Sequence, residues 1–396
     1  KLLFFQHTKR KLEKLLDGAV AHDEAMRSAL RSAIDSEGKE QLIQSSVYEW
    51  LIRLCCLQFI ELNHMKSTPT VSKCSETSSD EKELLCKIAL LEAFDTWHQN
   101  GLNLFKPMSR VIQTLSPQLL GKNGVLNALH RNLSAQLCGE VELIGWIHQA
   151  LLADRKKNII NRRDIIKTEE LPTATQIFTP KWIAQYMVEN TIGRLWMLNH
   201  PQSPLSQKLS YYIEPLEQQD DFLKISSPTE ITVCDPACGS GHLLTCAFDL
   251  LYTLYQEDGW RNEDIPSAIL THNLHGIELD GRVADLAQFA LAMKAIQMDP
   301  SFELNKTTLN LCVLENIFFS KCERSLLIDN SPRSLTPQAS LTLFEHATTF
   351  GSLIVPTPDQ VHAFKHWAER ADQCGWDRDL KRKLSLALQQ VEVLSK

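Results

Sequence analysis

The sequence lacks several features that would assign it to a membrane, a metal site or an export route. It has no run of about 18 apolar residues, so no transmembrane helix is expected. Its eleven cysteines include no Cys-x-x-Cys pair, which argues against a zinc site and for reduced cytoplasmic thiols. The apolar start from Lys1 to Phe5 is interrupted at Gln6, and no small-residue cleavage site follows, so we expect no signal peptide. Because residue 1 is not Met, we expect the true N-terminus to lie upstream.

The chain also lacks an excess of positive charge. Its formal net charge is −7, so any contact with nucleic acid must come from a local basic patch. One basic segment contains Arg155, Lys156, Lys157, Arg162, Arg163 and Lys167. These side chains form either a solvated helix face or a surface that contacts DNA phosphates.

Length and patterning predict about two domains without internal repeats. The 396 residues, 43% of them hydrophobic, are enough for about two domains with sizeable cores. Apolar residues at helical spacing predict helices in the first part of the chain: Val47, Trp50, Leu51 and Leu54, then Ile144, Ile147 and Leu151. Residues 66–82 are polar and predict a loop. We expect a helical domain over residues 1–165, an α/β part over 166–355 and a helical segment over 356–396.

The most informative string is Asp-Pro-Ala-Cys-Gly-Ser-Gly-His at residues 235–242. It follows a short apolar run at 231–234 and precedes apolar residues at Leu244, Ala247, Phe248 and Leu251. This pattern predicts a strand, a tight turn and a helix. Small residues let a ligand approach the backbone of the turn, and the helix N-terminus suits an anion. The spacing is not the G-x-G-x-x-G of dinucleotide-binding proteins.

Two further strands complete a β-α-β-α-β pattern. Residues 273–278 and 309–314 predict strands, and a helix between them carries Val283, Leu286, Ala287 and Ala290. Strands alternating with helices predict a doubly wound parallel sheet. Glu278, at the end of the second strand, is placed to accept hydrogen bonds from ribose hydroxyls; the alternative is a surface or helix-capping acid. Asp280 has the same two alternatives.

A second turn lies upstream of the sheet, at Phe178-Thr179-Pro180. Pro180 suits the first turn of a helix, and Thr179 suits the N-cap position before it. Ile183, Tyr186 and Met187 predict the apolar face of that helix.

Together these strings resemble one family. The 235–241 loop resembles motif I of S-adenosylmethionine-dependent DNA adenine-N6 methyltransferases, and the Phe-Thr-Pro turn resembles their motif X. Residues 174–196, 53–63 and 347–354 resemble the PglX family, the adenine-specific methyltransferases of BREX phage-defence systems. The resemblance implies a Rossmann-like methyltransferase sheet, S-adenosylmethionine as cofactor and methylation of adenine N6 in double-stranded DNA. It also implies a cytoplasmic bacterial protein with other BREX components as partners.

The resemblance also implies a set of cofactor-binding residues. In the family, motif X packs over the methionine moiety, motif I cradles it, the acid binds the ribose, and residues after the third strand lie near the adenine. Carried over to this chain, the expected residues are Phe178, Thr179, Pro180, Asp235, Pro236, Ala237, Cys238, Gly239, Ser240, Gly241, Glu278, Leu279, Asn316 and Ile317. For Asn316 and Ile317 the alternative is a plain loop.

One family motif is absent. Asn-Pro-Pro-Tyr, which binds the adenine amino group and stacks on the flipped base, does not occur in the chain, so the catalytic residues are unknown. The nearest string, Asp299-Pro300-Ser301-Phe302, predicts a helix-ending turn. We therefore expect the front part of a larger enzyme, silent alone, whose partner is its missing C-terminal part. The alternatives are a non-catalytic module that binds cofactor or DNA, and a methyltransferase acting on protein or RNA.

Overall fold

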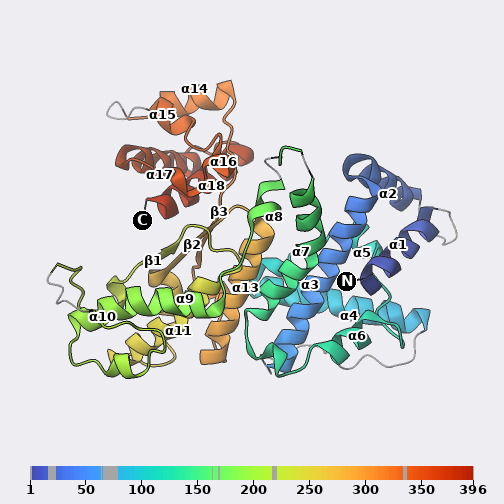
Figure 1. Ribbon diagram of the computed structural model, residues 1–396. Helices are drawn as coiled ribbons and strands as arrows, with labels where there is room; N and C mark the ends of the chain where they lie inside the picture. Colours follow the sequence, from blue (N-terminus) through green and yellow to red (C-terminus); the bar gives the residue numbers. More distant parts are fainter. Residues whose placement is uncertain are drawn as a thin grey trace. The chain divides into compact units, whose positions relative to one another are not determined.

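The computed structural model describes residues 2–16, 24–63, 65, 79–162, 164–167, 170–215, 221–332 and 337–395 (Figure 1). The chain divides into two compact units: residues 1–158 with 292–306, and residues 159–291 with 307–396. The domain boundaries expected from the sequence stay predictions beside this division. Most of the loop predicted at 66–82 lies outside the described residues, as does Arg163. No helix of the described part is long and apolar enough to cross a membrane.

Helices are the only regular secondary structure among the described residues of the first unit. Its helices are α1 (Leu2–Leu16), α2 (Glu24–Glu37), α3 (Lys39–Leu62), α4 (Asp80–Gln99), α5 (Arg110–Thr114), α6 (Val125–Asn132) and most of α7 (Leu143–Asn161). Helix α3 is buried along most of its length, and the predicted stripe with Trp50 lies in this core. The ring of Phe94 packs between Trp50 and Phe105, with centroid distances of 6.1 and 5.6 Å.

The second unit begins with three short helices, α8 (Leu171–Thr175), α9 (Lys181–Val188) and α10 (Arg194–Asn199). Helix α9 starts one residue later than predicted: Pro180 is the N-cap, and its carbonyl accepts hydrogen bonds from Ile183 and Ala184. Thr179 is therefore outside the helix. The predicted apolar face is also partly wrong, because Tyr186 and Met187 are exposed while Ala184 and Val188 are buried.

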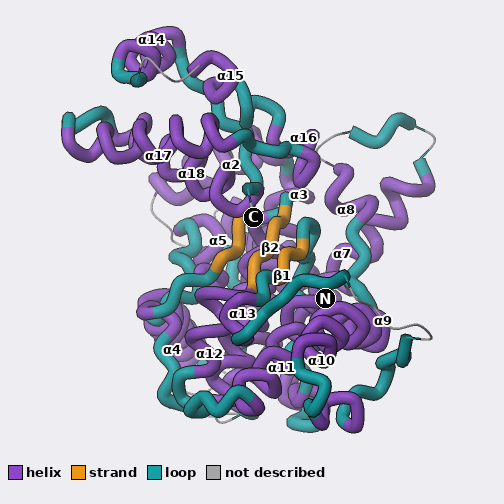
Figure 2. The backbone as a smooth tube through the Cα atoms, turned by 90° about the vertical axis from the view of Figure 1, so that its left-hand side faces the viewer, coloured by secondary structure: helices purple, strands orange, loops and turns teal. Residues whose placement is uncertain are grey.

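The centre of this unit is a parallel three-stranded sheet in the order β1-β2-β3 (Figure 2). The strands are β1 (Val233–Asp235), β2 (Leu274–Glu278) and β3 (Asn310–Val313), and they confirm the three predicted strands to within two residues at either end. They are connected through α11 (His242–Glu257), α12 (Ile265–Ala268) and α13 (Gly281–Met298). Asp235 pairs with Gly276, and Glu278 pairs with Val313, so the carboxyl ends of the strands meet at one edge.

Helices cover both faces of the sheet. Ile277 and Cys312 join an apolar cluster with α17 (Pro358–Gln373) and α18 (Arg378–Leu394). Gly276, the neighbour of Ile277, instead faces Leu244 of α11. Because successive strand residues point to opposite faces, α11 and α18 lie on opposite sides. The mostly helical fold with a small parallel sheet is compatible with an α/β protein.

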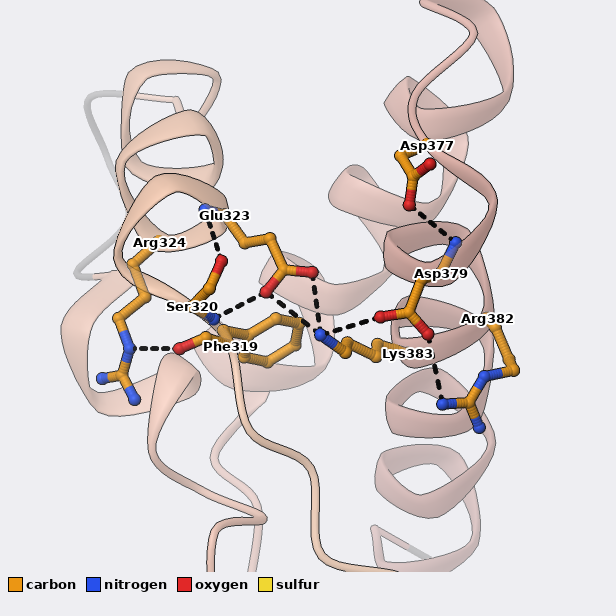
Figure 3. Close-up of polar contacts among 8 residues, drawn as sticks. All are labelled: Phe319, Ser320, Glu323, Arg324, Asp377, Asp379, Arg382 and Lys383. Carbon is orange, nitrogen blue, oxygen red and sulfur yellow. Dashed lines mark hydrogen bonds and ion pairs between the residues drawn. The ribbon is translucent and has the colours of Figure 1, made fainter.

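An ion-pair network ties the helices that follow β3 (Figure 3). These helices are α14 (Lys321–Asp329), α15 (Pro337–Leu341) and α16 (Ala347–Phe350), followed by α17 and α18. Ser320 and Glu323 form a capping box at the start of α14. The ammonium of Lys383 on α18 lies 2.9 Å from Glu323 Oε1 and 3.0 Å from Asp379 Oδ2. The network joins α18 to the start of α14, and we call it the α14–α18 network.

Candidate functional site

The loop after β1 is held against the end of β2 by two backbone donors. The amide of Cys238 donates to the carbonyl of Ile277 at 2.9 Å, and the amide of Gly239 donates to Oε2 of Glu278 at 2.9 Å. Asp235 Oδ1 accepts a hydrogen bond from the Ala237 amide at 3.1 Å. Glu278 therefore lies directly against the glycine loop, as the sequence predicts.

Two glycines of this loop have a left-handed backbone. Gly239 has φ +55° and Gly241 has φ +84°, conformations that other residues rarely adopt. A Cβ at position 239 would lie 3.1 Å from Cδ1 of Phe178, and one at 241 would lie 3.2 Å from Cα of Ala287. The conformation of the loop thus depends on the close contacts of Gly239 with Phe178 and of Gly241 with Ala287, as well as on its dihedral angles.

The loop and the upstream turn enclose a cavity of about 200 Å³. Its lining comes from residues 177–179 and 234–240, with Met187, His242 and Leu243. Small-molecule sites usually measure about 300–1,000 Å³, so this cavity accommodates only part of a drug-sized ligand. The structure thereby brings together Phe178 and Thr179 with the predicted loop residues from Asp235 to Ser240. A second cavity, of about 580 Å³ beside α17, contains none of the predicted site residues.

One residue that lines this cavity has a buried hydroxyl without a partner among the described residues. Ser240 is 3% exposed, and its Oγ makes no hydrogen bond to any described residue. A buried hydroxyl without a partner costs about 1–3 kcal/mol, so such atoms are rare and point to a ligand or a water. A residue that lines the cavity therefore carries a buried hydroxyl whose hydrogen-bonding capacity is unused among the described residues.

The carboxylate of Glu278 is already largely occupied by backbone amides. Oε2 accepts from Gly239, and Oε1 accepts from Leu279 at 2.8 Å and from Asp280 at 3.0 Å. A carboxylate offers about four acceptor positions, so about one remains, on Oε2. The side chain does two things at once: it holds the loop, and it keeps an acceptor for one further donor.

Burial disfavours the charged form of the carboxyl groups at this edge of the sheet. Burial raises the pKa of Glu278, although the three backbone hydrogen bonds oppose this shift. Burial likewise raises the pKa of Asp235. It also raises the pKa of the Cys234 and Cys238 thiols, so neither is a thiolate nucleophile at neutral pH. Burial is the main cause of the shift at both of these partly buried carboxyls, so a ligand carrying positive charge and hydrogen-bond donors would stabilise their charged forms.

The residues after β2 and β3 are arranged differently from the loop. Leu279 is 39% exposed beside Glu278. Asp280 accepts a hydrogen bond from the amide of Arg282 and pairs with its guanidinium at 3.0 Å, so it caps α13. None of the residues Pro180, Gly241, Glu278, Leu279, Asn316 and Ile317 lines the 200 Å³ cavity.

The two candidates for the adenine region are engaged elsewhere. Oδ1 of Asn316 accepts hydrogen bonds from the amide and the hydroxyl of Thr348, at 3.0 and 3.1 Å. Ile317 is 3% exposed and belongs to the apolar cluster beneath α17 and α18. The next residue, Phe318, is 56% exposed. Its ring, rather than the Ile317 side chain, is accessible from the surface.

The basic segment divides between two settings. Arg155, Lys156 and Lys157 lie on α7. Arg162 is ion-paired with Glu170 at 2.5 Å, and the amide of Lys167 donates to the same carboxylate. Arg162 is thus partly neutralised within the chain.

The Asp299–Phe302 string is a helix-ending turn, as predicted. The amide of Ser301 donates to Oδ1 of Asp299, and the amide of Phe302 donates to its carbonyl. Phe302 is 5% exposed, so its ring is a core residue rather than a surface that stacks on a base. Among the described residues, no three His, Cys, Asp or Glu side chains gather closely enough to hold a metal ion.

The sequence arguments missed His242. It is the last residue of the 235–242 string and the first of α11, it lines the cavity, and it is 4% exposed. Its position directly after the glycine loop is a signal that could have been followed. Met187 and Ile177, from the flanks of the upstream turn, were also missed as lining residues.

Comparison with known protein families gives a match over the sheet of the second unit. Residues 217–329 match the family described as MmeI, DNA-methyltransferase domain. This range contains all three strands and the glycine loop. The sheet and its loop therefore lie in the part of the chain that is similar to a DNA-methyltransferase domain.

Curated proteins then give a closer relationship. The chain is 31% identical over 425 aligned positions to the adenine-specific methyltransferase BrxX of Escherichia coli O9:H4 (strain HS), covering 91% of this chain and 35% of that protein. It is 27% identical to the adenine-specific methyltransferase PglX of Lacticaseibacillus casei (strain Zhang), covering 70% and 28%. The chain is thus related to the PglX family of adenine-specific methyltransferases, which confirms the resemblance noted in its sequence. It spans about a third of the length of these relatives.

Proposed function

We propose that the second unit binds S-adenosylmethionine as part of a DNA adenine-N6 methyltransferase of the BREX type. The small parallel sheet would then be part of a Rossmann-like methyltransferase fold. The observation that carries the proposal is the arrangement around Gly239: a glycine loop held by Glu278, next to a cavity lined by Ser240, whose buried hydroxyl has no partner among the described residues. The relationship to BrxX and PglX supports the same conclusion.

The residues present fit this cofactor. The cavity at the loop takes the methionine end, whose ammonium complements the partly buried Asp235 and whose polar atoms satisfy Ser240. The remaining acceptor position of Glu278 takes one ribose hydroxyl, and a second one has to share Oε2 with the Gly239 amide. Leu279, exposed beside Glu278, and Phe318, exposed after β3, offer apolar surface for the adenine ring. When bound, the cofactor supplies an electrophilic methyl group on a sulfonium.

The work of this chain's own residues is binding and orientation. The loop and the turn exclude water from the methionine end, and Glu278 fixes the ribose and with it the direction of the methyl group. Residues that activate adenine N6 are not assigned in this chain. Arg155, Lys156 and Lys157 are the candidates for contact with DNA phosphates, in a protein that we place in the cytoplasm with other BREX components and a C-terminal part as partners.

Calorimetric titration of the 396-residue chain with S-adenosylmethionine tests the proposal. We expect saturable binding, weakened about three- to tenfold by Ser240→Ala, because one buried hydrogen bond contributes about 0.5–1.5 kcal/mol. Without ligand, Ser240→Ala should unfold no more easily than the parent chain, because its hydroxyl has no partner to lose. No binding by the parent chain, or equal binding by both proteins, contradicts the proposal.

Transfer of labelled methyl groups to plasmid DNA separates the enzyme from its alternative. We expect none from this chain alone, and transfer when the chain is supplied with the C-terminal part of the enzyme. Cofactor binding with no transfer in either case supports the alternative, a non-catalytic module that binds the cofactor.

A further inference from the structure

The turn at residues 176–180 has no regular secondary structure, yet it forms one wall of the cavity. Its downstream end is fixed by α9, which begins at Lys181. On the loop side, a hydrogen bond to the Thr179 carbonyl and contacts to the Phe178 ring connect it to the methyltransferase loop. Both connections involve His242.

His242 reaches the turn with its ring nitrogen. Nδ1 lies 3.0 Å from the carbonyl oxygen of Thr179. A carbonyl can only accept, so Nδ1 must carry the proton in this contact. The residue is the first of α11 and is 4% exposed, so its ring is held by packing and cannot turn away into solvent.

The ring of His242 also supports Phe178. The two rings meet edge to face at a centroid distance of 5.5 Å and an angle of 62°. Phe178 is 7% exposed, and its other neighbour is Gly239, where a Cβ would lie 3.1 Å from the ring. The Phe178 ring is therefore packed against both His242 and Gly239, whose amide donates a hydrogen bond to Glu278.

We propose that His242 is a positioning residue that joins the upstream turn to the glycine loop and so gives the methionine end of the cofactor its closed cavity. This proposal rests on the proposed function, since it assigns the cavity to that cofactor. The Nδ1–H of His242 donates a hydrogen bond to the Thr179 carbonyl of the turn. The ring of His242 packs against Phe178 and so positions the Phe178 ring next to Gly239. Without this connection through His242, the turn and the loop would still fold, but the cavity between them would open.

Two variants of matched chemistry test the hydrogen bond. In His242→Asn the side-chain amide nitrogen takes the place of Nδ1 and can donate to Thr179, whereas in His242→Gln it ends near the position of Nε2. Both variants lack the ring, so the ratio of their affinities reports the hydrogen bond: we expect the Gln variant to bind S-adenosylmethionine about tenfold more weakly than the Asn variant, which itself binds more weakly than the parent chain. Equal affinities for the Asn and Gln variants would overturn the proposal.

His242→Phe tests the ring separately and replaces the Gln variant if that protein does not fold. It keeps an aromatic edge against Phe178 and removes the donor, so we expect affinity below that of the Asn variant with an unchanged melting temperature. An affinity equal to that of the parent chain would overturn the role of the N–H.

Hydrogen exchange of the ligand-free proteins distinguishes this proposal from the proposed function. We expect the backbone amides of residues 177–179 and 181 to exchange several times faster in the Gln and Phe variants than in the Asn variant and the parent chain. If the parent chain binds no S-adenosylmethionine, the proposed function fails, while this difference in exchange still supports the role of His242 in joining the turn to the loop. Equal exchange rates in all four proteins overturn the positioning role of His242, whatever the binding result.

Discussion

Carboxylates in two regions of the second unit have opposite electrostatic settings. At the carboxyl edge of the sheet, burial raises the pKa of Glu278 and Asp235, and no cation offsets it. In the α14–α18 network, burial acts the same way on Glu323, but hydrogen bonds from Lys383 and Ser320 lower its pKa overall. One region has its charges satisfied within the chain, while the other keeps carboxyls that a bound ligand would stabilise. Under the proposed function, the difference separates acids paired within the fold from acids that also contact the cofactor.

The largest expected effect is at the glycine loop. Gly239→Val should abolish S-adenosylmethionine binding, because a branched side chain at φ +55° collides with the ring of Phe178. The matched control is Gly375→Val in the turn before α18, where φ is +62° and no atom lies within 4 Å of the added Cβ. Calorimetry should find normal affinity for the control and only a loss of stability. Retained binding by the Gly239 variant would show that the loop does not shape the cofactor site.

The next effect concerns the acid of each region. Glu278→Gln replaces one acceptor oxygen with a donor that faces backbone amides or the ribose, so affinity should fall by about 1–3 kcal/mol, roughly ten- to a hundredfold. Glu323→Gln should lower the melting temperature and leave cofactor affinity unchanged. Weak binding by the Glu323 variant, or normal binding by the Glu278 variant, would erase the distinction between the regions.

Acid should affect the two regions at different pH values. The pKa of Glu278 is raised from its ordinary value of 4.5, so this carboxyl loses its charge, and cofactor affinity declines, while the pH is still above 4.5. The pKa of Glu323 is lowered from the same value, so its ion pair stabilises the fold until the pH falls below 4.5. Calorimetric titrations and thermal unfolding in parallel buffers measure both. Simultaneous loss of affinity and stability would contradict the assignment.

The smallest effect is expected for the network itself. Lys383→Met should lower the free energy of unfolding by about 1 kcal/mol, because the ammonium bridges Glu323 and Asp379 in a partly buried setting. Lys381→Met removes a more exposed pair with Asp372 and serves as the matched control, with no measurable change expected. Denaturant unfolding compares them. A cost as large for the Lys381 variant would mean that the α14–α18 network contributes no more than a surface pair.

The strands and the glycine loop were predictable because their signals are local. The apolar run before Asp235 and the glycines at 239 and 241 specify a strand and a turn without reference to the rest of the chain. Glu278 was predictable because parallel strands end at one edge, so a residue that closes β2 must lie near the loop that follows β1.

Tertiary contacts could not be predicted in the same way. The exposure of Tyr186 and Met187 depends on which face of α9 meets its neighbours, and spacing alone gives only a stripe. Thr179 suits an N-cap by type, but its carbonyl is held by His242, 63 residues along the chain. Asn316 and Ile317 lie where expected after β3, and the Thr348 contact and the core position become visible only when the chain folds back upon itself.

Gly276, in the middle of β2, carries a consequence for how sequences in this family can diverge. A Cβ there would lie 2.6 Å from Cδ2 of Leu311 and 3.0 Å from Sγ of Cys238 and Cδ1 of Leu244. All three obstacles are side chains, so alanine at 276 becomes acceptable when position 311 carries a smaller residue. At Gly241 the obstacle includes the backbone of Ala287, which no substitution removes. In an alignment of relatives, position 276 should covary with 311, and position 241 should remain invariant.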